Sequence, residues 1–251
     1  MLLNHTDTGT GYPVVLIHGF CESLTIWENI TPELSKRNRV IAIDLPGFGD
    51  SSLLEQDITI EKVATEVFEF LQEKGIKECM VIGHSLGGYV TLALAESYPN
   101  LLSKVVLFHS TSFADTEEKK NNRDKTLKFI KKRGLDLFFS SFLPTLFANS
   151  SDPTIGQIDK IARKTPIETV IAYTIAMRNR QDRTIVLQHL NKPILIIAGR
   201  EDNAVPIAQS RKMSQLITNS VLQELSVGHM GMYEDPANIL RILKDFIKKE
   251  V

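Results

Sequence analysis

The sequence predicts an α/β fold in which helices flank a mostly parallel central sheet and a helical lid is inserted after one strand. Three observations support this prediction. Short runs rich in β-branched residues alternate with longer amphipathic stretches, as in parallel strands joined by crossover helices. The alternation breaks once, between residues 109 and 193, where only helical patterns occur. With 251 residues, 43% of them hydrophobic, the chain is long enough for one large domain with a full core.

The strands of the core are expected in six short apolar runs, and its helices in five longer segments with apolar residues at three- and four-residue steps. The strand candidates are residues 14–17, 40–43, 80–82, 105–108, 194–198 and 221–225. The helix candidates are residues 26–35, 60–74, 86–97, 206–216 and 236–249. We expect helices on both faces of the sheet, because parallel sheets are usually covered on both sides.

The stretch from residue 112 to residue 187 is expected to form the lid, leaving residues 1–111 and 188–251 as the core. Two interpretations are open for its phenylalanine rings: they line an acyl pocket, or they pack the lid against the core. The helix candidates of the lid are residues 117–133, 135–147, 154–164 and 167–178. The rings in question belong to Phe138, Phe139, Phe142 and Phe147.

Composition and charge favour a small-molecule ligand. The net charge is −1 and the basic residues are scattered among acidic ones, which gives no support to a nucleic-acid partner or an anionic membrane surface. Cys21 and Cys79 form neither a zinc motif nor a redox motif, which indicates a reducing compartment. The first residues lack the pattern of a signal peptide, and no apolar run is long enough to span a bilayer. We therefore expect a cytoplasmic protein.

The strongest functional signal is the segment Gly83-His84-Ser85-Leu86-Gly87-Gly88, which directly follows an apolar strand and opens a helix. A sharp turn here exposes the serine hydroxyl, and glycines two residues to either side let neighbouring segments approach. The free amides and dipole of the helix point to where negative charge develops on a substrate oxygen. The alternative is a turn in which Ser85 only caps the helix. His84 is expected to point away from the path of the hydroxyl.

A serine nucleophile needs a base and a carboxylate that orients the base. Asp202 lies in the loop after the strand expected at residues 194–198, at the carboxyl edge of the sheet where ligands bind in open α/β folds. An equally strong alternative is that Asp202 caps the helix beginning near Pro206 or forms a turn.

His229 is the candidate base. It follows the strand expected at residues 221–225 and stands between Gly228 and Gly231, which free the backbone to direct the ring. Histidine accepts and returns a proton near neutral pH. Taken alone, His229 is equally consistent with a surface loop, but the order serine, acid, histidine is that of one hydrolase architecture. His109 ends a strand at the same edge and either contacts substrate or is a buried histidine of the pocket wall.

With these motifs the chain resembles the α/β-hydrolase superfamily over nearly its whole length. Besides the loops of Ser85, Asp202 and His229, residues 13–20 are similar to the family's His-Gly strand end, and residues 44–51 to its Pro-Gly-x-Gly turn. The resemblance implies the α/β-hydrolase fold and a serine-nucleophile, lid-containing, esterase-like member.

The resemblance also assigns roles near the start of the chain. It implies that the backbone amides of Phe20 and Leu86 form the oxyanion hole, while the pair His18-Gly19 shapes the turn. We expect Asp44 and Ser51 to be structural and to hold a loop beside the sheet.

Two departures from the family pattern affect the expectations. Only twelve residues precede Pro13, so the antiparallel strands that usually open the fold are reduced to one or to a tight pair. The nucleophile position holds Ser85 rather than the aspartate of haloalkane dehalogenases and soluble epoxide hydrolases. Neither of these two reactions is therefore the leading hypothesis for this chain.

We expect hydrolysis of a small-molecule carboxylic ester through an acyl-enzyme, with Ser85 as nucleophile, His229 as base, Asp202 as orienting acid, and no metal or cofactor. One alternative keeps the three residues but acts on a carbon–carbon bond or lactone, or eliminates pyruvate. Another is a non-catalytic ligand receptor. The further substrate contacts expected are His109, Phe139 and Phe142. An arginine reaching the pocket from the lid favours the first alternative, the candidates being Arg123, Arg178 and Arg183.

Overall fold

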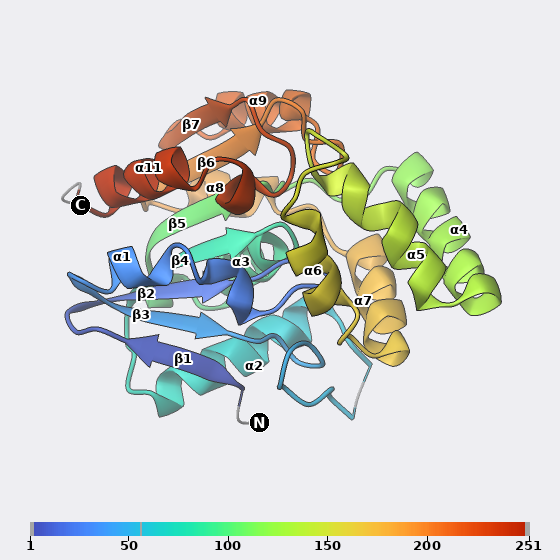
Figure 1. The fold of residues 1–251 in the computed structure, drawn as a ribbon. Coiled ribbons are helices and arrows are strands. Elements are labelled where there is room, and N and C mark those ends of the chain that lie inside the picture. Colours follow the sequence, from blue (N-terminus) through green and yellow to red (C-terminus); the bar gives the residue numbers. More distant parts are fainter. Residues whose placement is uncertain (1–2, 56, 249–251) are drawn as a thin grey trace.

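The centre of the fold is a seven-stranded sheet in the order β1-β3-β2-β4-β5-β6-β7 (Figure 1). The computed structural model describes residues 3–55 and 57–248. β1 pairs antiparallel with β3, and all other neighbouring strands are parallel. The six predicted strands and the mostly parallel sheet are therefore confirmed, and one antiparallel strand precedes them within the described residues. The strands are β1 (His5–Thr8), β2 (Tyr12–Ile17), β3 (Asn38–Ile43), β4 (Cys79–His84), β5 (Leu102–Phe108), β6 (Ile194–Gly199) and β7 (Ser220–Leu225).

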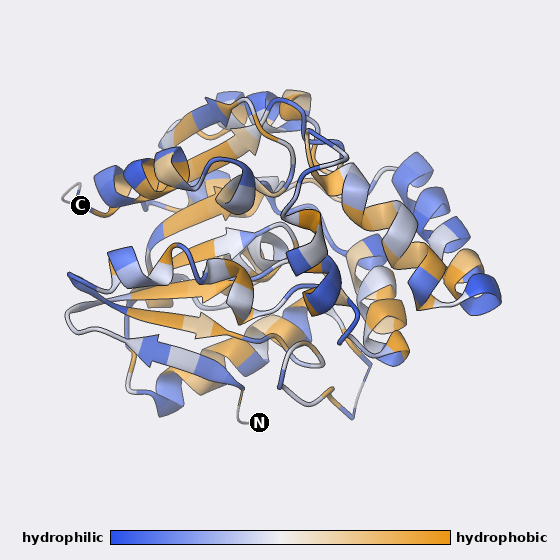
Figure 2. Ribbon diagram, in the orientation of Figure 1, coloured by the Kyte–Doolittle hydropathy of each residue, from blue (hydrophilic) through white to orange (hydrophobic). Residues whose placement is uncertain are grey.

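Helices cover both faces of this sheet. Successive side chains of a strand point to opposite faces, so Val15 and Ile17 of β2 enter one core and Val14 and Leu16 enter the other. The first core contains residues of α2 (Ile60–Glu73), α3 (Leu86–Ser97), α8 (Thr184–His189) and α9 (Ile207–Leu216). The second contains residues of η1 (Leu24–Trp27), α1 (Thr31–Leu34) and α11 (Pro236–Lys248). In Figure 2 the strands are mostly hydrophobic, as burial on both faces requires.

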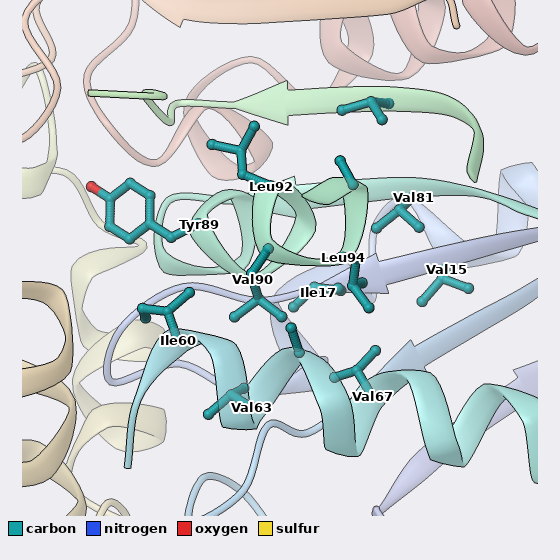
Figure 3. Packing of buried hydrophobic residues seen from close by; sticks show 14 of the residues in the cluster. Val15, Ile17, Ile60, Val63, Val67, Val81, Tyr89, Val90, Leu92 and Leu94 are labelled. Atoms are coloured by element: carbon teal, nitrogen blue, oxygen red, sulfur yellow. The ribbon is translucent and has the colours of Figure 1, made fainter. Parts of the chain in front are cut away.

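The helix α2 illustrates how the sequence sets an element. The hydroxyl of Thr59 accepts a hydrogen bond from the amide of Lys62 at 3.2 Å, which caps the first turn. Its buried residues recur every three or four positions, so they form one stripe along the helix. Figure 3 shows Val63 and Val67 of this stripe packed beside Val90 of α3. The stripe consists of Ile60, Val63, Ala64, Val67, Phe70 and Leu71.

Five helical elements lie between β5 and β6 and precede α8. They gather beyond the ends to which the arrowheads of the parallel strands point (Figure 1). One of them, α7, is tied to the turn after β3, because Tyr173 donates a hydrogen bond to the carbonyl of Pro46 at 2.9 Å and Thr169 donates to that of Gly47 at 3.1 Å. The elements are α4 (Glu117–Arg133), α5 (Leu135–Phe142), η3 (Leu143–Leu146), α6 (Ile155–Ala162) and α7 (Ile167–Asn179).

Two predicted helices are wrong in length. The helix expected at residues 26–35 is the short turn η1 followed by α1, since Pro32 lacks an amide hydrogen and is accommodated only in the first turn of a helix. The helix expected at residues 135–147 ends at Phe142 for the same reason, and Pro144 lies in the turn η3. The predicted end of the last helix at residue 249 lies outside the described residues.

Three short elements were not predicted at all, namely η2 (Pro99–Leu101), α8 and α10 (Gly231–Glu234). α8 runs across the predicted boundary at residue 188, and its Leu187 is buried in the core with α2 and α3. Nowhere in the described part of the chain is a helix both long enough and apolar enough to traverse a bilayer.

Candidate active site

Ser85 lies at the turn between β4 and α3 with φ 50° and ψ −111°. This backbone conformation is strained for a residue with a side chain. Two hydrogen bonds hold it: Ser85 N–H donates to the carbonyl of Phe108 at 2.9 Å, and the Ser110 hydroxyl donates to the carbonyl of Ser85 at 2.7 Å. The structure supports no side-chain cap by Ser85, since its side chain makes no capping hydrogen bond to α3.

The glycines around Ser85 are required by close backbone approach. A Cβ atom on Gly83 would lie 2.4 Å from the carbonyl oxygen of Gly87. One on Gly87 would lie 2.3 Å from the carbonyl oxygen of Ile17, at the end of the neighbouring strand β2. Both distances are far below van der Waals contact, so the tight turn expected from the sequence depends on these two residues.

Asp202 and His229 are brought together from the loops after β6 and β7. The His229 Nδ1 lies 2.8 Å from Asp202 Oδ2, and both side chains are buried. Burial would raise the pKa of Asp202, but the facing His229 outweighs it, and the net pKa lies well below the ordinary value. The ionised carboxylate therefore accepts the Nδ1 proton of His229, which leaves Nε2 as the ring's free proton acceptor.

The second role considered for Asp202 is also present. Its Oδ1 accepts hydrogen bonds from the amides of Ala204 and Val205, both at 2.8 Å, so the carboxylate orders the turn before α9 as well as facing His229. The two interpretations of this residue are therefore compatible.

Ser85 and His229 line the same cavity, which has a volume of about 220 Å³. Its walls come from the loops after β2, β4, β6 and β7 and from α3, α4, α5, η3 and α7. A larger cavity of about 420 Å³ lies beside Asp44 and Tyr233 and contains neither Ser85 nor His229. The residues around the 220 Å³ cavity are Phe20, Glu22, Ser85, Tyr89, Lys119, Asn122, Arg123, Thr126, Phe142, Leu146, Met177, Ala204, Val205 and His229.

The three predicted substrate contacts differ in position. Phe142 lines the cavity. Phe139 is 1% exposed and packs in the hydrophobic core, which favours the packing interpretation for this ring. His109 is also 1% exposed and stands outside the cavity lining, where its Nδ1 accepts the amide hydrogen of Gly199 at 3.1 Å. Burial lowers the pKa of His109 to about 4, so the ring is neutral.

Of the three candidate arginines, only Arg123 reaches the cavity. Arg178 pairs with Asp124 at 2.7 Å near the surface. Arg183 is buried between Glu61 and Glu96, at 2.5 and 2.9 Å, where it joins α2 and α3 to the start of α8.

Phe20 and Leu86, whose amides are the expected oxyanion hole, follow the neighbouring strands β2 and β4. Phe20 follows β2 and lines the cavity, while Leu86 is the first residue of α3, where the helix leaves amide hydrogens without internal partners. The hydrogen bonds found within the described residues include none donated by either amide. Both are therefore free to donate to a ligand.

The neighbours of Phe20 are fixed by buried polar groups. Leu45 N–H donates to Nε2 of His18 at 3.0 Å, so the proton of this ring is on Nδ1 and is donated to the carbonyl of Gly19 at 2.7 Å. The amide of Gly19 donates in turn to Oε2 of Glu22 at 2.6 Å. The pair His18-Gly19 thus shapes the turn, as the resemblance implied.

The side chain of His84 connects two loops from behind the cavity. Its Nδ1 lies 2.9 Å from Oε2 of Glu22, and its Nε2 lies 2.9 Å from the carbonyl oxygen of His229. Both partners are acceptors, so the ring needs both of its protons and is charged. Burial would lower the pKa of His84, but the charge of Glu22 outweighs it, and the net pKa is raised. Facing this cation, Glu22 has a pKa below its ordinary value despite its burial.

Asp44 and Ser51 have the structural role expected of them. Asp44 accepts hydrogen bonds from the amides of Leu24 at 2.7 Å and Asp50 at 3.0 Å. The Ser51 hydroxyl donates to the carbonyl of Asp44 at 2.8 Å and accepts from the amide of Asn4 at 2.9 Å.

Sequence reasoning missed several residues that shape the site. Glu234 accepts hydrogen bonds from the amides of Gly228 at 3.0 Å, Met230 at 3.2 Å and Ala148 at 2.9 Å, and so fixes the loop of His229. Glu22 was missed in the same way. These two glutamates give no local signal for their long-range contacts, because Glu22–His84 and Glu234–Ala148 join residues 62 and 86 positions apart.

No group of three or more His, Cys, Asp or Glu residues in the described ranges is arranged to hold a metal ion. The site combines a strained serine and a histidine that share one cavity with a carboxylate that orients the histidine.

Comparison with known proteins identifies the family of the chain. Residues 12–151 and 107–236 match the model of the alpha/beta hydrolase fold family. The uncharacterized hydrolase YugF of Bacillus subtilis (strain 168) is 30% identical over 246 residues, which covers 94% of this chain and 89% of the relative. The 2-hydroxymuconate semialdehyde hydrolase of Pseudomonas sp. (strain CF600) is 28% identical, covering 97% and 89%.

Among solved structures, a thermophilic esterase from Thermogutta terrifontis superposes with a TM-score of 0.92 at 29% identity, covering 98% of this chain and 93% of the esterase. The family match, the fold and the relatives together show that the chain is a hydrolase that belongs to the alpha/beta hydrolase fold family.

Proposed function

We propose that this hydrolase cleaves small carboxylic esters through an acyl-enzyme intermediate formed on Ser85. The observation that carries the proposal is the position of Ser85. Its strained backbone, at φ 50°, presents it to a cavity that it shares with His229, whose Nδ1 lies 2.8 Å from the buried Asp202. A nucleophile, a base and a group that orients the base are the three parts that acyl transfer by serine requires.

The proposed reaction has two halves. In the first, Nε2 of His229 accepts the Ser85 hydroxyl proton, the serine oxygen attacks the ester carbonyl, and the same proton is returned to the departing alcohol. In the second, His229 removes a proton from water, the hydroxide attacks the acyl-serine, and the acid is released as Ser85 regains its proton. Asp202 holds the ring of His229 and stabilises its charged form, which is required in both halves.

The amides of Phe20 and Leu86 are the proposed oxyanion hole. They approach the turn at Ser85 from β2 and α3, and neither is occupied by a hydrogen bond within the described residues. Removing one donor of such a pair typically lowers kcat by about 10²–10³-fold. The neighbouring buried contacts of His18 and Glu22 would hold Phe20 in place before substrate arrives.

Residues 112–187 are proposed to act as the lid that selects the substrate. Lys119, Phe142, Leu146 and Met177 from this stretch line the cavity. The volume of about 220 Å³ is below the range of roughly 300–1,000 Å³ typical of pockets for drug-sized ligands, so the lid favours short acyl chains. We propose a cytoplasmic enzyme with a small-molecule ester or acyl substrate.

The names of the relatives support the general chemistry and allow a second candidate. One similar structure is described as an esterase, and one relative as a semialdehyde hydrolase. Cleavage of a carbon–carbon bond or lactone, or elimination of pyruvate, by the same three residues is therefore the second candidate function. The observation that favours it is Arg123 in the cavity wall, which is the lid arginine that this chemistry would use.

The test is hydrolysis of p-nitrophenyl esters from acetate to decanoate by the wild type and by Ser85→Ala. We predict Ser85-dependent turnover that is greatest for the shorter chains, with kcat lowered by roughly four to six orders of magnitude in Ser85→Ala, because the members of such a triad act as a unit. Equal, slow turnover by both proteins would exclude the ester proposal and direct attention to the second candidate.

A further inference from the structure

We infer that the substrate of this site carries a free carboxylate, which Lys119 and Arg123 of α4 bind at the wall of the cavity. The inference rests on the proposed function in so far as it takes the cavity of Ser85 to be the substrate site. It adds the class of substrate: a short ester, or a related acyl compound, with one anionic end.

The first argument is the pattern of α4 itself. Four of its residues line the cavity at positions i, i+3, i+4 and i+7 of the helix, namely Lys119, Asn122, Arg123 and Thr126. Residues at this spacing form one continuous face. The face that a helix turns toward a pocket or core is ordinarily apolar, but here every residue is polar and two are cationic (compare α4 in Figure 2). Such a face is suited to a ligand that carries charge.

The second argument is that the cations around the cavity are not fully compensated. Asp115 accepts from Arg123 at 2.5 Å and from Arg180 at 2.7 Å, so a single carboxylate serves two guanidinium groups. The ammonium of Lys119 donates to a neutral acceptor, the carbonyl of Ala204, at 3.1 Å. Burial lowers the pKa of Lys119, as expected for an ammonium partly removed from water.

The other carboxylates of the site are already committed to buried partners. Glu22 faces the charged ring of His84 and the amide of Gly19. Asp202 faces His229 and the two amides of the following turn. Among the Lys, Arg, Asp and Glu residues that line the cavity, the two cations Lys119 and Arg123 therefore exceed the one carboxylate, Glu22, which already faces His84. An anionic substrate would balance this excess.

The remaining side chains of the cavity wall restrict the polarity and size of the rest of the substrate. Phe142, Leu146 and Met177 supply an apolar surface to the cavity. The combination of an apolar wall, a cationic helix face and a small volume fits the monoester of a short dicarboxylic acid better than a neutral fatty ester. Lys119 and Arg123 are thus assigned as residues that determine specificity.

The experiment compares two p-nitrophenyl esters with five-carbon acyl groups, the anionic hemiglutarate and the neutral valerate. We expect the wild type to have a kcat/KM at least about tenfold higher for the hemiglutarate, a preference that decreases with added salt. The ratio of the two kcat/KM values should fall about tenfold in Lys119→Met and in Arg123→Gln. Lys125→Met removes an exposed charge of α4 that is not in the cavity wall, so it should keep the wild-type ratio.

The outcomes separate the inference from the proposed function. Ser85-dependent turnover of both esters with equal kcat/KM would overturn the inference and leave the esterase proposal intact. If neither ester is cleaved, the esterase proposal fails, and calorimetric binding of monomethyl glutarate and methyl valerate to Ser85→Ala decides the inference. Tighter binding of the anion that Lys119→Met abolishes would support it, and equal binding of the two esters would overturn it.

Discussion

At the scale of single residues, Glu22 holds the buried ring of His84 in its charged form. We predict that Glu22→Gln returns the ring of His84 to its neutral form and lowers its pKa, because the effect of burial is then unopposed. Oε2 of Glu22 makes both contacts, and a glutamine oxygen in its place can still accept from Gly19, so the fold should be kept. Titration of the His84 ring by NMR measures the shift.

The same pair makes stability depend on pH in a defined direction. A raised pKa in the folded state stabilises the protein fully below the unfolded value of about 6.5, and this contribution is lost as pH rises through the folded-state pKa of His84. Urea unfolding of the wild type should show this loss, and Glu22→Gln should lack it. Glu28→Gln changes an exposed glutamate nearby and is the control. An unchanged titration of His84 in Glu22→Gln would mean that Glu22 does not hold its charge.

At the scale of elements, the four-residue helix α10 determines where His229 stands. Its Glu234 accepts from Gly228, Met230 and Ala148 and so joins the loop after β7 to the chain after η3. We predict that Glu234→Ala lowers kcat by up to about a hundredfold, because three amides, two of them half-buried, lose their acceptor and the ring is displaced. Stopped-flow or steady-state ester hydrolysis measures the change.

The control for this prediction is Glu201→Ala, which removes an exposed carboxylate from the neighbouring loop after β6. It should leave kcat near the wild-type value. If Glu234→Ala lowers only the stability to urea and leaves kcat unchanged at temperatures where it is folded, α10 supports the fold without positioning His229.

Periodicity made most elements predictable. The stripe of α2 and the apolar runs of the six parallel strands follow directly from residue spacing, and the structure confirms them. Prediction was wrong where proline interrupts an amphipathic pattern, at Pro32 and Pro144. It also missed α8 and α10, because four to six residues are too few to establish a helical period.

At the scale of the whole molecule, the site residues meet because of the order of the elements along the chain and the common direction of the parallel strands. Ser85, Asp202 and His229 follow β4, β6 and β7, and parallel strands bring their carboxyl ends to one edge of the sheet, so three distant positions converge. This convergence was predictable from sequence. The contacts of Glu22 with His84, and the approach of α4 to the loop after β6, link residues 62 and 85 positions apart, and no local pattern encodes them.

The strained backbone at Ser85 lowers the stability of the folded protein. A non-glycine residue at φ 50° and ψ −111° costs roughly 1–3 kcal/mol, and glycine adopts that conformation without this penalty. We therefore predict that Ser85→Gly unfolds at a higher urea concentration than Ser85→Ala, and the proposed role of Ser85 predicts that both are inactive. A lower midpoint for the glycine variant would mean that the strain at position 85 is smaller than the entropic cost of glycine in the unfolded chain. A sequence selected for stability alone would place glycine at position 85. The serine found there marks a position where stability is reduced in favour of the proposed reaction.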